Sequence, residues 1–239
     1  MKKTLWIAIV GALAASVIAA SAQTEVLSGN AVGYVKVDIA SQLTMINVPF
    51  DDMSDVPVMF TNAIGTQVSG LGATLYAWNG LSWDSYSWKT RGGWSDAAGL
   101  ILEPGKAYFL QRPDSWSGTS NITLTGEVPM ATNTARTVTG AGNLNTISFS
   151  YPVSIPFTNT FLAVNGGGLG ATLYAWNGLS WDSYSWKTRG GWADAAAVNM
   201  EPGLGYFFKA ADAGAGFTWS QVRPYTWPGP AMPASAGPF

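Results

Sequence analysis

The sequence predicts an all-β protein made of two tandem related halves of antiparallel strands, either β-sandwiches or barrel-like sheets, with short helical turns. Two observations predict this class. An aromatic stretch around an Asn-Gly pair occurs twice, and each copy is followed by a Glu-Pro-Gly turn and a short Tyr-Phe run. Asn-Gly and Pro-Gly dipeptides between short apolar runs are typical of strands joined by tight turns.

The repeated stretch covers residues 70–98 and 168–196, an offset of 98 residues (168 − 70). The two copies differ only where Ser95 is replaced by Ala193. The flanking segments resemble each other only loosely. Either function has preserved this block or recent gene conversion has copied it, and the sequence leaves both explanations open.

Each copy predicts a β-hairpin with Asn-Gly at its tip. A type I′ turn at Asn79-Gly80 needs positive φ at both residues, which Asn and Gly tolerate best. That turn pairs Trp78 with Leu81 across the hairpin. The Glu-Pro-Gly segment at 103–105 predicts a type II turn with positive φ at its glycine.

The candidate ligand-binding residues form an aromatic set on one face of each predicted hairpin. Side chains alternate between the two faces along a strand. The first face carries Tyr76, Trp78, Trp83, Tyr174, Trp176 and Trp181, whereas the opposite face carries Tyr86, Trp88, Tyr184 and Trp186. Two interpretations remain open. All of these rings are core, or the first face is an exposed platform that stacks on a sugar ring or a partner.

Residues 1–22 are typical of a Sec signal peptide. Two lysines form the basic start, an apolar run follows, and Ala-Ser-Ala at 20–22 fits the small-x-small cleavage rule. The run is shorter than the ~20 residues of a membrane-spanning helix. We therefore expect an exported protein, secreted, periplasmic or at the cell surface, with no membrane span after signal cleavage.

Four segments follow from these patterns. They are the signal peptide (1–22), a first β repeat (23–125), a second β repeat (126–222) and a Pro-rich disordered tail (223–239). The first repeat is predicted to contain strands over 33–38 and 43–48, a short helix over 54–65, the aromatic hairpin, and strands over 108–110 and 121–128. In the second repeat, residues 156–165 replace the short helix.

The composition excludes several kinds of site. The chain has no His and no Cys, which rules out a Ser-His-Asp triad, a Cys nucleophile, disulfides and His- or Cys-ligated zinc or haem. Its formal net charge is −2 without a basic cluster, which argues against nucleic acid as a partner. We expect no cofactor, no metal site and no catalytic residue.

The carboxylates could in principle form a calcium site or a catalytic pair, and the sequence favours neither. The acidic residues at 51, 52 and 55 could ligate calcium, but they lack the spacing of an EF-hand loop, so a solvated turn is favoured. A carboxylate pair could in principle cleave glycosidic bonds. The recurring candidates are Asp84, Asp96, Glu103, Asp182, Asp194 and Glu201. Two near-identical active sites in one small chain would be unusual.

Three motifs stand in a fixed order: Asn-Ala-Val-Gly-Tyr-Val at 30–35, Tyr-x-Trp-Asn-Gly in each hairpin, and Pro-Gly-x-x-Tyr-Phe after it. In this order the chain resembles a group of uncharacterised secreted β-rich proteins of Gram-negative bacteria. The resemblance covers most of the chain after the signal peptide. It implies export and a β fold, but no activity and no functional residues.

Together these observations favour an exported non-catalytic binding protein that holds a polysaccharide through exposed aromatic hairpins. The alternatives are a structural or adhesive protein of the cell envelope and a glycoside-active enzyme. The sequence does not decide whether the two halves share one core, or the oligomeric state.

Overall fold

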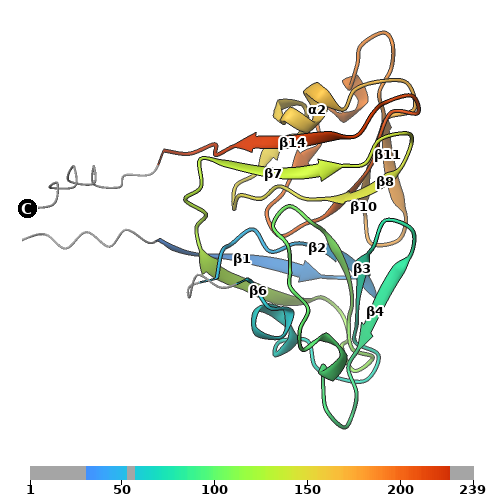
Figure 1. The fold of residues 1–239 in the computed structure, drawn as a ribbon. Coiled ribbons are helices and arrows are strands. Elements are labelled where there is room, and N and C mark those ends of the chain that lie inside the picture. Colours follow the sequence, from blue (N-terminus) through green and yellow to red (C-terminus); the bar gives the residue numbers. More distant parts are fainter. Residues whose placement is uncertain (1–30, 53–56, 227–239) are drawn as a thin grey trace, which may run out of the picture. The chain divides into compact units, whose positions relative to one another are not determined.

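The computed structural model describes residues 31–52 and 57–226 (Figure 1). These residues form antiparallel sheets with a few short helices, which confirms the predicted all-β class. Among them, no helix is both long and apolar enough to cross a membrane. The predicted signal peptide and residues 227–239 of the predicted tail lie outside the described residues.

Two four-stranded sheets share one strand order. The first runs β2-β5-β3-β4 and the second β8-β13-β10-β11. Their bounds are β2 (Leu43–Ile46), β3 (Thr74–Trp78), β4 (Trp83–Ser87), β5 (Tyr108–Gln111), β8 (Leu144–Ile147), β10 (Thr172–Trp176), β11 (Trp181–Ser185) and β13 (Tyr206–Lys209). The registers match as well, since Tyr76 pairs with Phe109 in one sheet and Tyr174 with Phe207 in the other. We call residues 31–128 the first half and residues 129–226 the second half.

The remaining described strands form three two-stranded sheets. They are β1 (Val32–Ile39) with β6 (Ser120–Glu127), β7 (Asn133–Val138) with β14 (Phe217–Val222), and β9 (Ile155–Pro156) with β12 (Asn199–Met200). Figure 1 shows β1 beside β6 and β7 beside β14. Since β6 ends at Glu127, the expected border between residues 125 and 126 falls inside this strand.

The hairpin turn differs from the predicted one. Trp78 pairs with Trp83, so four residues form the loop instead of two. The side-chain Oδ1 of Asn79 accepts hydrogen bonds from the backbone N–H groups of Leu81 (3.0 Å) and Ser82 (2.9 Å), which closes the loop locally. Only the glycine has positive φ in this loop, at 103° for Gly80. The predicted type I′ turn and the pairing of Trp78 with Leu81 are therefore wrong, whereas positive φ at Gly80 is confirmed.

The short helices lie between the strands. They are η1 (Thr61–Gly65), η2 (Ser95–Ala97), η3 (Phe157–Asn159), α2 (Phe161–Asn165) and η4 (Ala193–Ala195). The helix predicted over 54–65 is shorter than expected, because Met59 instead forms a β-bridge with Ile101. The first residues of that predicted helix, 54–56, lie outside the described residues. In the second half, Thr160 caps α2 by accepting a hydrogen bond from Ala163 N (3.2 Å).

Each half has its own apolar core. The last tryptophan of each repeat, Trp94 or Trp192, is only 7% exposed. Its indole N–H donates to the short helical segment of its own half, at Gly65 O (2.9 Å) or Ala163 O (2.9 Å). A buried indole needs such an acceptor. The predicted ligand-binding face of each hairpin packs in neither of these two cores but in a third apolar cluster.

Candidate functional site

The six aromatic residues predicted to bind a ligand lie in one cluster between the two halves. Each of them is half-buried. Together they surround the buried Phe109 and Phe207, which lie opposite Tyr76 and Tyr174 in the two sheets. The residues of the cluster that come from the hairpins are Tyr76, Trp78, Trp83, Tyr174, Trp176 and Trp181. The prediction that they share one face is right, because a register shift of two residues preserves side-chain alternation.

The rings cross between the halves in a reciprocal way. Phe207 of the second half lies 5.9 Å from Trp78 and 5.6 Å from Trp83, measured between ring centroids. Phe109 of the first half lies 5.5 Å from Trp176 and 5.7 Å from Trp181. Edge-to-face pairs at these distances stabilise a contact beyond their buried area. The cluster therefore joins the halves.

Each half also donates one indole hydrogen bond to the other half. The indole N–H of Trp78 donates to Leu144 O (3.2 Å), and that of Trp176 donates to Leu43 O (2.9 Å). These carbonyls begin β8 and β2, so each hairpin is bonded to the other half's sheet. Aromatic rings on the opposite hairpin face pack instead against the core of their own half; they are Tyr86, Trp88, Tyr184 and Trp186.

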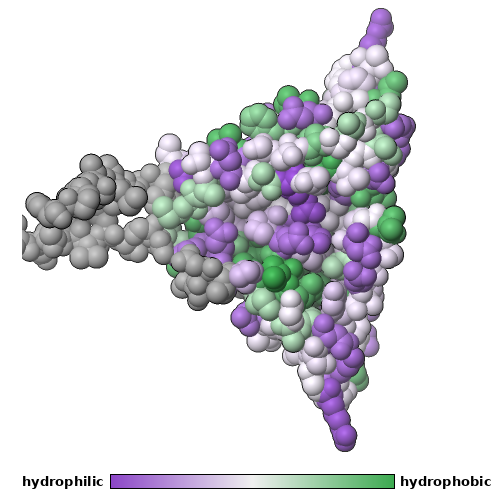
Figure 2. All heavy atoms as spheres, in the orientation of Figure 1, coloured by the Kyte–Doolittle hydropathy of each residue, from purple (hydrophilic) through white to green (hydrophobic). Residues whose placement is uncertain are grey.

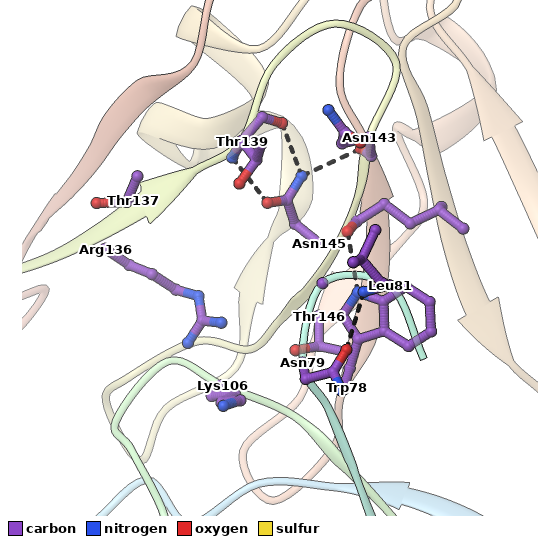
Figure 3. Close-up of a pocket in the computed structure, with 12 residues that line it drawn as sticks. Trp78, Asn79, Leu81, Lys106, Arg136, Thr137, Thr139, Asn143, Asn145 and Thr146 are labelled. Carbon is purple, nitrogen blue, oxygen red and sulfur yellow. Dashed lines mark hydrogen bonds between the residues drawn. The ribbon is translucent and has the colours of Figure 1, made fainter. Parts of the chain in front are cut away.

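Each hairpin tip also forms one wall of a cleft. The Trp78 cleft, of about 390 Å³, lies between the first hairpin tip and the β7–β8 region of the second half (Figure 3). The Trp176 cleft, of about 770 Å³, lies between the second hairpin tip and the β1–β2 region of the first half. The predicted aromatic face is thus used in packing, and the two tryptophans at its ends reach a cleft.

No family model, curated protein or solved structure matches this chain.

Two asparagines of the Trp78 cleft have structural roles. Asn145 accepts from Thr139 N (2.8 Å) and donates to Thr139 O (3.0 Å), which fixes the turn before β8. Asn79 donates to Ser82 Oγ (3.1 Å) and Asp84 Oδ1 (3.0 Å) at the hairpin tip. Their polar groups are therefore engaged in local hydrogen bonds.

Arg136 and Lys106 are the charged residues of the Trp78 cleft. Figure 3 shows the Arg136 side chain reaching from β7 toward the space in front of Lys106. Burial lowers the pKa of the Arg136 guanidinium, because desolvation disfavours its charged form; nearby Glu103 and Tyr108 partly oppose this effect. Lys106 Nζ pairs with Glu103 Oε1 at 3.0 Å.

Two buried polar atoms of this cleft lack a hydrogen-bond partner in the structure. They are Nε of Arg136 and Oγ1 of Thr146. Buried polar groups in proteins are almost always paired, so both atoms are unusual; because they are buried beneath the cleft wall, they do not themselves face its open space. The sequence analysis missed both residues. A signal existed, since Arg136 places a charge at a position where the first half has an apolar residue, Val35.

The Trp176 cleft has different electrostatics. Its lining includes Asp38 and Glu201, and no Lys or Arg among the described residues that line it. Glu201 accepts a hydrogen bond from Ser154 Oγ (2.9 Å). Two clefts with related geometry therefore present opposite charge.

The carboxylates considered as a catalytic pair have separate local partners. In the first half, Asp84 accepts a hydrogen bond from Asn79, Asp96 forms an ion pair with Lys89, and Glu103 forms one with Lys106. In the second half, Asp182 accepts a hydrogen bond from Asn177, and Asp194 forms an ion pair with Lys187. Within residues 31–52 and 57–226, no group of three or more acidic side chains could hold a metal ion. The calcium alternative included Asp55, which lies outside these residues.

Proposed function

We propose that this chain is an exported, non-catalytic binding protein whose two clefts hold segments of a polysaccharide. The observation that carries the proposal is the Trp78 cleft, whose lining combines an indole with the side chain of Arg136 and the exposed hydroxyls of Thr137 and Thr139. Sugar rings present C–H groups that pack on aromatic faces while their hydroxyls form hydrogen bonds. A cleft of about 390 Å³ falls within the range of small-ligand sites.

Two clefts in one chain favour a polymer over a small sugar. When one segment binds, the second contact with the same polymer becomes intramolecular, and avidity exceeds single-site affinity by roughly 10²–10⁴ where the geometry permits. The matching strand orders of the two halves support an origin by duplication. The signal-peptide pattern at residues 1–22 supports export to the compartment where such polymers occur.

Affinity electrophoresis in gels that contain single polysaccharides tests this function. We expect at least one polymer to retard the protein. Leu81 and Leu179 line the two clefts and are 91% and 90% exposed, so Leu81→Ser and Leu179→Ser should reduce retardation without loss of stability. If no polymer retards the wild-type protein, the proposed function is wrong. Reducing ends that appear during incubation would instead support the enzyme alternative.

A specific observation also favours the structural or adhesive alternative. The two exposed leucines lie at equivalent hairpin tips, where they could contact another protein chain. The face shown in Figure 2 mixes hydrophilic and hydrophobic residues. Sedimentation without polysaccharide separates the alternatives. Concentration-dependent self-association that Leu81→Ser weakens would favour adhesion.

A further inference from the structure

The two clefts differ at equivalent positions in a consistent way. Leu43 and Leu144 begin the equivalent strands β2 and β8, an offset of 101 residues (144 − 43). At this offset Arg136 corresponds to Val35. Lys106 corresponds to Leu204 at the offset of 98 residues of the repeat. The Trp78 cleft therefore carries two cations where the related positions are apolar.

Arg136 has an unusual environment for a charged side chain. It lies on the inward face of β7, opposite the buried Trp219 of β14. No ion pair or hydrogen bond joins its guanidinium to any described residue, and its buried Nε has no partner. Desolvation of the Arg136 guanidinium is offset only in part by the nearby Glu103 carboxylate, which does not contact it, so an anionic ligand group that reaches the guanidinium gains a strong interaction.

We propose that the Trp78 cleft binds an acidic sugar, with the carboxylate or sulfate oxygens of the sugar on the Arg136 guanidinium and its ring beside Trp78. This proposal rests on the proposed polysaccharide-binding function. A guanidinium forms two parallel charge-assisted hydrogen bonds to such a group, which gives both strength and orientation. Glu103 forms its ion pair with Lys106 and acts on Arg136 only at longer range, so Arg136 is the main anion-binding group.

The neighbouring hydroxyls complete the site. Thr137 and Thr139 line the cleft and are exposed. Each hydroxyl both donates and accepts, as sugar hydroxyls require. In the Trp176 cleft the position of Thr139 is Asp38, whose carboxylate would repel an acidic sugar. The Trp176 cleft therefore takes a neutral unit of the polymer.

Gels with three polymers test the proposal: polygalacturonate for carboxylates, dextran sulfate for sulfates and dextran as a neutral polymer. Arg136→Val carries the residue that the first half has at this position, so we expect it to fold. It should weaken binding to the acidic polymer about tenfold or more and leave neutral binding unchanged. Arg91→Gln removes a positive charge from an exposed loop outside the cleft and should have little effect.

A second variant keeps the test valid if Arg136→Val does not fold. Thr139→Asp changes an exposed side chain and copies the charge of the Trp176 cleft, so it should weaken acidic-polymer binding with an unchanged melting temperature. Comparison of the polygalacturonate and dextran sulfate gels identifies the anionic group.

The outcomes separate this proposal from the function on which it rests. Retardation by dextran alone, or an equal loss in Arg136→Val and Arg91→Gln, contradicts the acidic-sugar site but retains polysaccharide binding. Absence of retardation in every gel contradicts both. Because the chain has a formal net charge of −2, general attraction to polyanions does not explain an Arg136-dependent loss.

Discussion

At the scale of single residues, Gly80 shows how backbone conformation restricts the hairpin tip. Its φ of 103° lies where L side chains are strained, although a Cβ there would meet no atom within 4 Å. We expect Gly80→Ala to lower the free energy of unfolding by about 1–2 kcal/mol through backbone strain alone. Urea denaturation measures this change.

Gly99 offers the matched control for that substitution. A Cβ at Gly99 also meets open space, but its φ lies outside the strained range. Gly99→Ala should leave stability unchanged or raise it slightly. Equal losses in both variants would mean that the positive φ of Gly80 adds no specific backbone strain.

Single residues also show why the aromatic face was predictable but the turn was not. The face of Trp78 and Trp83 depends only on alternation, so it survives a register error of two residues. The turn depends on the side chain of Asn79, which accepts two backbone N–H groups and stabilises a four-residue loop. The dipeptide rule for Asn-Gly considers backbone φ and not this competing side-chain bond.

At the scale of elements, each Pro-Gly turn forms a unit with the strand that follows it. The Tyr108 hydroxyl accepts a hydrogen bond from Glu103 N (2.9 Å) and donates to Ile101 O (3.3 Å). In the second half, the Tyr206 hydroxyl accepts from Glu201 N (2.9 Å) and donates to Asn199 O (2.9 Å). Positive φ at Gly105, 75°, confirms the predicted turn.

This unit makes stability depend on alkaline pH. Burial raises the pKa of the hydroxyls of Tyr108 and Tyr206 to about 12, above the ordinary value of about 10. The folded state therefore keeps protons that the unfolded state releases, so stability present below pH ~10 is lost as pH rises toward ~12. Denaturation at stepped pH should show this decline.

Tyr108→Phe separates the titration from the hydrogen bonds. At neutral pH the variant should lose about 1 kcal/mol, because the bond to Glu103 N is missing. Between pH ~10 and ~12 its stability should fall less steeply than that of the wild type. Parallel slopes would mean that Tyr108 ionises in the folded state as readily as in the unfolded chain.

The strands that the sequence analysis missed depend on long-range contacts. β7 reads Asn-Thr-Ala-Arg-Thr-Val, which has little apolar alternation, and its partner β14 begins 84 residues after its start (217 − 133). Strand propensity reflects packing on neighbours more than local sequence. Arg136 was missed for the same reason, since only the pairing of β7 with β14 turns it inward.

At the scale of the whole molecule, the aromatic cluster couples the two halves. Phe207 is 7% exposed and contacts tryptophans of the first half, so Phe207→Ala should lower the free energy of unfolding by about 3–5 kcal/mol. Phe161→Ala, at a ring that is 44% exposed on α2, should cost much less. Similar losses would indicate that the contact between the halves contributes little.

A double-mutant cycle tests the coupling directly. Trp78→Ala and Phe207→Ala remove opposite sides of one ring pair between the halves. Their combined loss should be smaller than the sum of the single losses by about 0.5–1.5 kcal/mol. Additive losses would mean that the two rings act independently.

The most direct test of the account is the response of the indole N–H signals in ¹H–¹⁵N spectra as tetragalacturonate is added. We expect the Trp78 signal to move, because this indole lies at the wall of the Trp78 cleft. The signals of Trp94 and Trp192, which are buried in the separate cores, should stay in place. A Trp78 signal that remains fixed while the sugar binds, or binding that moves only the core signals, would contradict the account.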